Sequence, residues 1–275
     1  MNTILLAVLL VAGIGLIAGV GLSVASVVMA VPTDETADAI REVLPGANCG
    51  ACGFSGCDGY AAALSGGQTA QTNLCAPGGN DAAKAIAAIL GVEAGEIKPM
   101  AAVVHCNGTT ENSKQKLTYQ GVQSCVMAAQ LFGGQKECVY GCLGYGDCVR
   151  ACPYDAISIC DGVARVNPLA CKACRACISA CPKHLIELLP LYETRAAVLC
   201  KNHNKGAFTR KECTAGCIGC MKCTKVCEFD AIRVENNTAH VDYDKCTGCG
   251  KCAAQCPVGA IHLLTLAKES GAQAG

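Results

Sequence analysis

Cysteine is the residue type with the clearest chemical potential in this chain, which has 25 cysteines among 275 residues. Sixteen of them form four tight runs: Cys138, Cys142, Cys148 and Cys152; Cys171, Cys174, Cys177 and Cys181; Cys217, Cys220, Cys223 and Cys227; and Cys246, Cys249, Cys252 and Cys256. Three runs have the spacing C-x2-C-x2-C-x3-C, and proline follows the last cysteine in three. Such closely spaced thiols can form disulfides or bind metal.

The spacing favours one of these chemistries. Disulfides suit small secreted chains, whereas this cysteine count is odd and no cleavable secretion signal is evident. Zinc sites usually combine two C-x2-C pairs across a longer loop. The observed runs have the spacing of bacterial ferredoxin iron–sulfur sites. The sequence therefore predicts [4Fe–4S] clusters, which carry electrons one at a time.

Paired runs predict crossed ligand sets, because in two-cluster ferredoxins the fourth cysteine of one run binds the other cluster. The four expected sets are Cys138, Cys142, Cys148 and Cys181; Cys171, Cys174, Cys177 and Cys152; Cys217, Cys220, Cys223 and Cys256; and Cys246, Cys249, Cys252 and Cys227. Crossing would lock the two runs of each pair together and hold their clusters close.

A fifth set lies upstream and is built differently. Cys49, Cys52, Cys57 and Cys75 have the spacing C-x2-C-x4-C-x17-C, with glycines between the first three. Glycine lets the backbone turn sharply and bring N–H groups near sulfide. Four thiolates match one more [4Fe–4S] cluster, with a zinc knot as the alternative. The total expected is five clusters and twenty ligands.

Two departures and five further cysteines complete this inventory. The first run is longer, C-x3-C-x5-C-x3-C, and Glu228 follows Cys227 where proline is usual. An ionised Glu228 beside a cluster would lower its potential; alternatively, it faces solvent. The cysteines outside the five sets are Cys106, Cys125, Cys160, Cys200 and Cys213.

Roles are expected for four of these five cysteines. Cys160, in a hairpin strand, is expected to be a buried small apolar residue. Cys213 precedes Cys217 by four residues and could replace a ligand. Cys106 and Cys125 are either inert thiols or part of a further metal site shared with other cysteines.

The N-terminal segment 4–31 is apolar and uncharged over 28 residues. A membrane-spanning helix needs about 20 such residues, and a secretory signal would have a basic start and a shorter apolar core. The segment is predicted to be a retained transmembrane helix, with cleavage after Ala30 as the alternative. Gly15 and Gly19 form a G-x-x-x-G that permits a partner helix; a lone anchor is the other possibility.

The rest of the chain is predicted to be α+β, following this N-terminal transmembrane helix. The expected divisions are 1–32, transmembrane anchor; 33–91, small helical 4Fe–4S domain; 92–135, connector; 136–189, first ferredoxin-like domain; 190–210, linker; and 211–275, second ferredoxin-like domain and tail. Each ferredoxin-like domain would hold two [4Fe–4S] clusters.

Local patterns place several elements within these divisions. Apolar periodicity predicts helices over 34–44 and 81–90, the second with Asp81 as N-cap and Gly91 after its end. Hairpins are expected over 157–166 and 232–241, because Asp161-Gly162 and Asn236-Asn237 are turn pairs between short apolar strands. Residues 201–205 are basic and polar, which indicates a solvated loop or a patch for an acidic partner.

The composition gives no support for nucleic acid as a partner, and it indicates that few large side chains are available to fill the core. Lys and Arg balance Asp and Glu at 22 each, so there is no basic surplus for nucleic acid. The chain has no Trp and only 4% aromatic residues. Bound clusters would fill the space that large side chains usually occupy.

Two segments carry a family resemblance: Asn48-Cys49-Gly50-Ala51-Cys52-Gly53-Phe54-Ser55-Gly56-Cys57 and Gly141-Cys142-Leu143-Gly144-Tyr145-Gly146-Asp147-Cys148. With the apolar N-terminus and the repeats, the chain resembles the B subunit of the Rnf complex, a membrane-bound ion-translocating ferredoxin:NAD oxidoreductase. The resemblance implies that reduced ferredoxin delivers electrons, which pass to membrane subunits and a flavin-bearing subunit that reduces NAD. The energy released would drive Na⁺ or H⁺ across the membrane.

The location and two competing functions follow from the same observations. Clusters need reduced thiolates, iron and sulfide, so the chain is expected to cross the cell (inner) membrane once with its cluster domains on the cytoplasmic side. It has no nucleotide or flavin motif and no charge within its apolar segment, so NAD reduction and ion transport would belong to partners. The alternatives are a membrane-anchored polyferredoxin serving a hydrogenase or dehydrogenase, and a zinc-scaffolded interaction protein.

Overall fold

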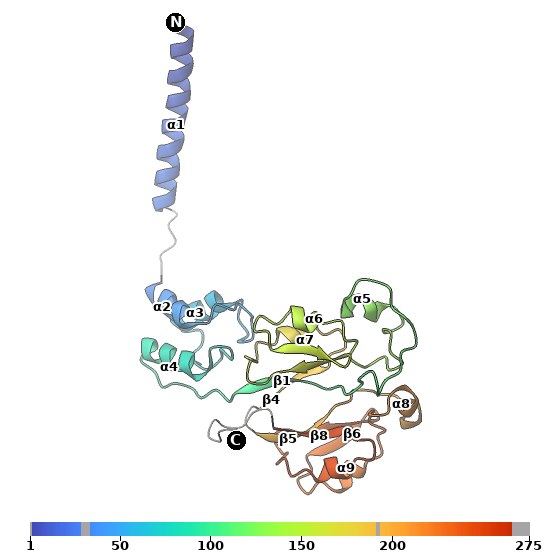
Figure 1. Cartoon of the computed structure of the whole chain (residues 1–275). Helices are drawn as coiled ribbons and strands as arrows, with labels where there is room; N and C mark the ends of the chain where they lie inside the picture. The colour runs from blue at the N-terminus through green and yellow to red at the C-terminus, as the bar shows by residue number, and fades with distance from the viewer. Residues whose placement is uncertain (1, 29–33, 191–192, 266–275) are drawn as a thin grey trace, which may run out of the picture.

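The computed structural model describes residues 2–28, 34–190 and 193–265 (Figure 1). The possible cleavage point after Ala30 and the tail from residue 266 lie outside the described residues. The helices are α1 (Asn2–Val28), α2 (Glu35–Val43), α3 (Cys57–Ser65), α4 (Gly79–Leu90), α5 (Cys125–Gln130), α6 (Asp147–Arg150), α7 (Ala176–Ala180), α8 (Gly206–Glu212), α9 (Lys222–Lys225) and α10 (Lys251–Ala254). The strands are β1 (Met100–Val104), β2 (Ile157–Cys160), β3 (Val163–Val166), β4 (Ile186–Pro190), β5 (Thr194–Val198), β6 (Ile232–Glu235), β7 (Thr238–Val241) and β8 (Ile261–Thr265).

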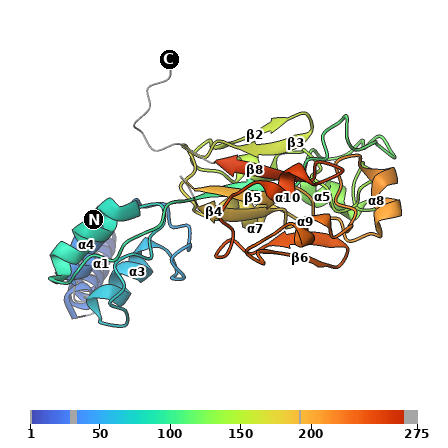
Figure 2. The same cartoon turned by 90° about the horizontal axis from the view of Figure 1, so that it is seen from below.

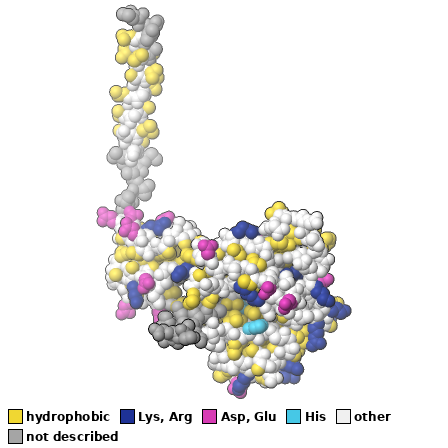
Figure 3. Space-filling view, viewed as in Figure 1, with side chains coloured by type: hydrophobic (Ala, Val, Ile, Leu, Met, Phe, Trp, Pro, Cys, Tyr) yellow, Lys and Arg dark blue, Asp and Glu magenta, His cyan; other side chains and the backbone are white. Residues whose placement is uncertain are grey.

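Helix α1 stands apart from the rest of the chain (Figure 1). Its segment Val8–Ser26 is long and apolar enough to cross a membrane, and none of it is buried within the protein. Figure 3 shows apolar side chains along α1, and acidic side chains where α2 begins. A helix with this surface can bury its side chains only in lipid or against other apolar helices. It therefore has the properties of a membrane anchor.

Helices α2 to α4 pack around a small apolar core. Asp34 caps α2, because its carboxylate accepts the N–H groups of Thr36 at 3.0 Å and Ala37 at 3.1 Å. Ile40 of α2, Tyr60 of α3 and Ile86 of α4 are fully buried. The predicted helix 34–44 is confirmed within one residue at each end.

Helix α4 differs from its prediction at its start. It begins at Gly79 with Gly78 at the N-cap, so Asp81 lies in the first turn and the prediction of an Asp81 N-cap is wrong. An acidic residue in the first turn still favours the helix through the macrodipole. The predicted end is confirmed, since Gly91 forms the C-cap with a left-handed φ of 68°.

The strands form four separate two-stranded antiparallel sheets. The hairpins β2–β3 and β6–β7 match the two predicted ones. The other sheets join distant segments, β1 with β4 and β5 with β8. β1 lies within the expected connector and β5 within the expected linker, so each connecting segment supplies a strand to the cluster-bearing part.

The helical N-terminal part and the sheets occupy different regions. Seen from below, α3 and α4 lie at one end, the strands lie in the middle, and α5 and α8 lie at the other end (Figure 2). The buried cores of the sheet region consist largely of cysteine, alanine and short aliphatic side chains. Cysteine Sγ atoms therefore line the interior where larger side chains would ordinarily be.

Candidate iron–sulfur sites

One local structure recurs in all four cysteine runs. The third cysteine of each run lies in a one-turn helix: Cys148 in α6, Cys177 in α7, Cys223 in α9 and Cys252 in α10. The residue preceding each helix has a left-handed backbone, including Arg175 with φ 65° and Met221 with φ 59°. This turn reverses the chain sharply and directs neighbouring cysteines toward one space.

The N-terminal set is gathered around the start of α3. The Asn48 side-chain oxygen accepts the Cys57 N–H at 2.8 Å, and Gly56 precedes the helix with φ 98°. Burial raises the pKa of the Cys75 thiol, and the sulfurs of Cys57, Cys52 and Cys49 raise it further. The structure thus brings all four predicted cysteines of this set together.

Cys152 lies near the set built on Cys171, as the expected crossing would require. Burial raises the pKa of the Cys177 thiol to about 11, and the sulfurs of Cys171, Cys174 and Cys152 act in the same direction. Cys152 belongs to the preceding run in the sequence. It lies with the other three because α6 and α7 are packed against each other.

The two C-terminal sets are also assembled in one region. A cavity is lined by Cys217, Cys220, Cys223 and Cys256, which is the predicted crossed set. Burial raises the pKa of the Cys252 thiol, with additional effects from Cys246 and Cys249. Cys227, the expected fourth member, packs against the same core as Cys246 and Cys252.

The remaining predicted set is arranged differently from the expectation. One cavity is lined by Cys142, Cys148 and Cys181 as expected, but its fourth cysteine is Cys125 from the start of α5. Cys138 lines a second cavity instead. The longer first run permits this separation, because three residues lie between Cys138 and Cys142 where the other runs have two.

The described cysteines suit anionic clusters in two respects. The sulfurs of Cys171, Cys227 and Cys256 accept backbone N–H groups at 3.4, 3.3 and 3.2 Å. Such hydrogen bonds stabilise thiolates and raise cluster potentials. Buried thiols resist ionisation in an apolar core, and bound iron supplies the positive charge that makes the thiolate favourable there.

A single zinc ion and a four-iron cluster require different spacings of their thiolates. Within the described ranges, no group of three or more His, Cys, Asp or Glu side chains is placed to hold a single metal ion. Thiolates on one zinc ion, at about 2.3 Å from it, would have to converge closely. A cluster instead spreads four thiolates over four iron atoms, so it accepts the wider spacing.

Three residues outside the sets resolve other sequence expectations. Glu228 is largely exposed and pairs with Lys251, which supports the solvent-facing alternative. Cys160 is exposed on β2, so the prediction that it is buried is wrong; it stands near the hairpin turn on the strand's open face. Asn202 is only 1% exposed, so the prediction of a solvated loop over 201–205 is wrong at this residue, because its side-chain amide donates to Cys138 and Glu212 in the interior.

Fold and thiol arrangement together define an iron–sulfur protein with several [4Fe–4S] sites and an apolar N-terminal helix. Family models agree on the cofactor. Residues 199–263 match a 4Fe–4S dicluster domain, residues 168–188 match a 4Fe–4S binding domain, and residues 44–77 match a domain described as a putative Fe–S cluster.

Curated relatives match nearly the whole chain. It is 45% identical to the B subunit of the Na(+)-translocating ferredoxin:NAD(+) oxidoreductase complex of Acetobacterium woodii over 262 residues, 95% of this chain and 78% of the relative. It is 41% identical to the B subunit of the ion-translocating oxidoreductase complex of Methanosarcina acetivorans, over 96% of this chain and 100% of the relative. The B subunit of a proton-translocating ferredoxin:NAD(+) oxidoreductase complex from Clostridium ljungdahlii is 39% identical over 90% of this chain and 87% of the relative.

The chain therefore belongs to the family of Rnf complex B subunits, as its sequence motifs predicted. Sequence reasoning missed the positions of Cys125 and Cys138, and it did not single out Lys136 or Asn202 as cavity residues. The available signal was the surplus of cysteines in segments with no motif.

Proposed function

We propose that this chain relays electrons from reduced ferredoxin toward NAD within an ion-translocating oxidoreductase complex. It would pass the electrons through its clusters to membrane subunits and a flavin-bearing subunit. The observation that carries the proposal is that neighbouring cysteine sets adjoin. The Cys49 sulfur of the N-terminal set is near enough to raise the pKa of the Cys174 thiol, and Cys177 of that next set shares a buried core with Cys148 of a third. Clusters held in such succession are suited to electron hopping.

The proposed arrangement contains at least five [4Fe–4S] clusters. Residues 1–32 would form the anchor, 33–91 the first cluster domain, 136–189 the first ferredoxin-like domain, and 211–275 the second ferredoxin-like domain and tail, with 92–135 as connector and 190–210 as linker. The cluster-bearing part lies on the cytoplasmic side, where iron, sulfide and reducing conditions are supplied. The anchor crosses the cell (inner) membrane once and holds the relay beside the membrane subunits.

The chain leaves the other chemistry to partners. Its described apolar span, Val8–Ser26, carries no charged side chain, and an ion pathway usually requires polar or ionisable groups within the membrane. The sequence similarity to the curated relatives covers 90–96% of this chain, including the N-terminal cysteine set and both ferredoxin-like parts. This favours membership of such a complex over a polyferredoxin attached to a hydrogenase.

Purification from membranes with a tag on this chain tests the proposal. We expect co-purification of multi-span proteins and a flavoprotein, and NAD reduction that depends on reduced ferredoxin. A second preparation lacking residues 1–33 should keep its iron but lose the membrane subunits. A hydrogenase as the stable partner, or an iron-free chain, would overturn the proposal.

A further inference from the structure

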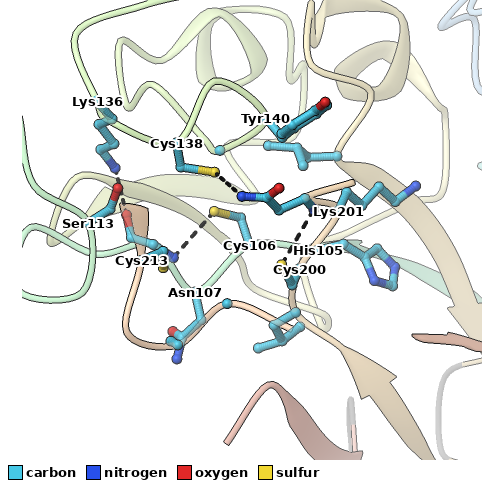
Figure 4. Close-up of a pocket in the computed structure, with 17 residues that line it drawn as sticks. His105, Cys106, Asn107, Ser113, Lys136, Cys138, Tyr140, Cys200, Lys201 and Cys213 are labelled. Carbon is cyan, nitrogen blue, oxygen red and sulfur yellow. Dashed lines mark hydrogen bonds between the residues drawn. The ribbon is translucent and has the colours of Figure 1, made fainter. Parts of the chain in front are cut away.

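A cavity between the two ferredoxin-like halves is lined by four cysteines that no single sequence motif contains. They are Cys106, Cys138, Cys200 and Cys213, and Figure 4 shows them around this space. Cys106 follows β1, Cys200 follows β5 and Cys213 ends α8. Three of the four are less than 10% exposed. The long-range strand pairs therefore converge on a thiol-lined interior.

Two of these sulfurs lie near Gly108. A Cβ atom added at Gly108 would lie 3.4 Å from Cys106 Sγ and 3.9 Å from Cys213 Sγ. The Gly108 N–H also donates to Cys106 Sγ at 3.3 Å. The Gly108 backbone is therefore in contact range of both sulfurs and donates to one of them.

The other two sulfurs are joined through Asn202, which is 1% exposed. Its backbone N–H donates to Cys200 Sγ at 3.4 Å, and its side-chain amide donates to Cys138 Sγ at 3.5 Å. The Glu212 carboxylate accepts from the same amide nitrogen at 2.7 Å and so fixes its orientation. These N–H···S bonds are of the kind that the expected ligands Cys171, Cys227 and Cys256 receive.

A buried positive charge lies against the same cavity. Lys136 is 2% exposed, and its Nζ donates to the carbonyls of Gly108 at 2.7 Å and Gly162 at 2.9 Å. In the described part of the chain it forms no ion pair with a carboxylate. Buried charges are ordinarily paired. An anionic ligand in the cavity would supply the missing counter-charge.

Cys125 lines the neighbouring cavity, where Cys138 was expected. Asp147, which directly precedes Cys148, accepts the Ser124 hydroxyl and the Val126 N–H, each at 2.9 Å. These bonds clamp both neighbours of Cys125 and hold its thiol beside Cys148. The cavity that Cys125 lines is also lined by Cys142, Cys148 and Cys181.

We infer that Cys106, Cys138, Cys200 and Cys213 hold a further [4Fe–4S] cluster, and that Cys125 completes the cluster of Cys142, Cys148 and Cys181. This inference rests on the proposed iron–sulfur function. Every cysteine except Cys160 then belongs to a set of four. Cys160 is the one cysteine on an exposed strand face away from these sets.

The added site connects the two halves of the relay. On one side, Cys142 of the first half donates its N–H to Cys106 Sγ at 3.3 Å. On the other side, Cys200 packs against the buried core that contains Cys217, in the second half. The cluster would therefore accept an electron from one half and pass it to the other, with the iron alternating between its oxidised and reduced states.

Counting iron and acid-labile sulfide in the anaerobically purified full chain tests the inference without any mutation. Six clusters predict about 24 of each per chain, and five predict about 20. The double variant Cys200→Ala/Cys213→Ala should lose about four of each, together with one reduced-state EPR signal. Cys160→Ala is the matched control and should lose none.

The possible failures are distinguishable. A wild-type count of about 20, or a double variant with the wild-type count, would overturn the inference while leaving the relay function intact. Zinc at about one per chain in place of the additional iron would also overturn it. An iron-free chain would remove the proposed function itself. If the double variant fails to fold, the wild-type count and its EPR spin integration still decide.

Discussion

The backbone N–H of Cys142 donates a hydrogen bond to the Cys106 sulfur at 3.3 Å, although 36 positions separate the two residues. Cys142 lies in a ferredoxin-type run, whereas Cys106 lies beyond the end of β1 in a segment without such a run. The contact exists because β1 pairs with β4, from Met100↔Pro190 to Val104↔Ile186, and so brings the segment after β1 beside the first cluster domain. The apparent connector is thus part of the electron-transfer region.

Crossed ligation predicts the effect of removing Cys181. Cys181→Ser should perturb the cluster built on Cys142 and Cys148, because the Cys181 thiol lines their cavity. EPR and Mössbauer spectra of the reduced protein would measure this. Cys152→Ser is the matched variant and should affect the cluster of Cys171, Cys174 and Cys177. If Cys181→Ser instead removed the signal of its sequence neighbours, the crossed assignment would be wrong.

The sequence predicted those parts of the structure that depend on local patterns. The hairpins carry turn pairs between apolar strands, and the helices α2 and α4 have apolar periodicity. The pairings β1–β4 and β5–β8 were not predicted, because contacts between such distant segments leave no signal in either one. Cys160 was misplaced for a related reason: strand alternation does not indicate which face is covered.

The cysteine sets likewise include groupings that local spacing predicted and groupings that it did not. In four of the five sets, the cysteines grouped by spacing and the crossing rule also lie near one another in the structure, and their ligation stays a prediction. Spacing did not predict that Cys125 and Cys138 line different cavities, because this depends on how the enlarged first run bends and where α5 lies. Asp147 shows the physical cause, since its carboxylate binds the N-terminus of α5 through Ser124 and Val126.

The N-terminal set should be sensitive to one glycine. Gly56 has φ 98°, and an added Cβ would lie 2.9 Å from the Asn48 oxygen that accepts the Cys57 N–H. Gly56→Ala should therefore displace Cys57 and lose about four iron atoms per chain, in addition to a backbone strain of about 1–3 kcal/mol. Iron analysis and the EPR signal of this cluster would report it.

Gly91→Ala provides a matched control for that substitution. Gly91 also has a left-handed backbone, with φ 68°, but nothing lies within 4 Å of the position of its Cβ. The substitution Gly91→Ala should therefore lower the stability only through backbone strain and leave the iron content unchanged. Equal iron contents in Gly56→Ala and wild type would contradict the role given to this turn.

The ion pair between Glu228 and Lys251 predicts that Glu228 has a small effect on the midpoint potential of the nearby clusters. From the sequence alone, an ionised Glu228 beside a cluster could have lowered that potential strongly. Glu228 has an exposed carboxylate and its charge is compensated by Lys251, so solvent screens it. Glu228→Gln should change the midpoint potential of the nearby clusters little. Lys251→Gln should lower it more, because it leaves the carboxylate uncompensated. Potentiometric titration measures both, and a large rise in Glu228→Gln would show that the carboxylate acts directly on a cluster.

Lys183 should raise the potential of the cluster held by Cys142, Cys148 and Cys181, because it lines the same cavity. Its Nζ is fixed by hydrogen bonds to the carbonyls of Gly133 at 2.9 Å and Val139 at 2.6 Å. Burial lowers the pKa of this lysine, whereas the nearby Cys138 sulfur acts in the opposite direction. A fixed positive charge beside this cavity favours the reduced cluster, because the reduced cluster carries one more negative charge than the oxidised one.

Lys183→Met should therefore lower that cluster's midpoint potential by roughly tens of millivolts, as expected for a charge partly screened by solvent. Lys84→Met, on the exposed side of α4, removes the same charge far from this cavity and should leave the potential unchanged. Redox titration followed by EPR would separate this cluster from the others, and iron content would confirm that all clusters remain. An unchanged potential in Lys183→Met with full iron content would show that the lysine serves only to hold the 133–139 loop.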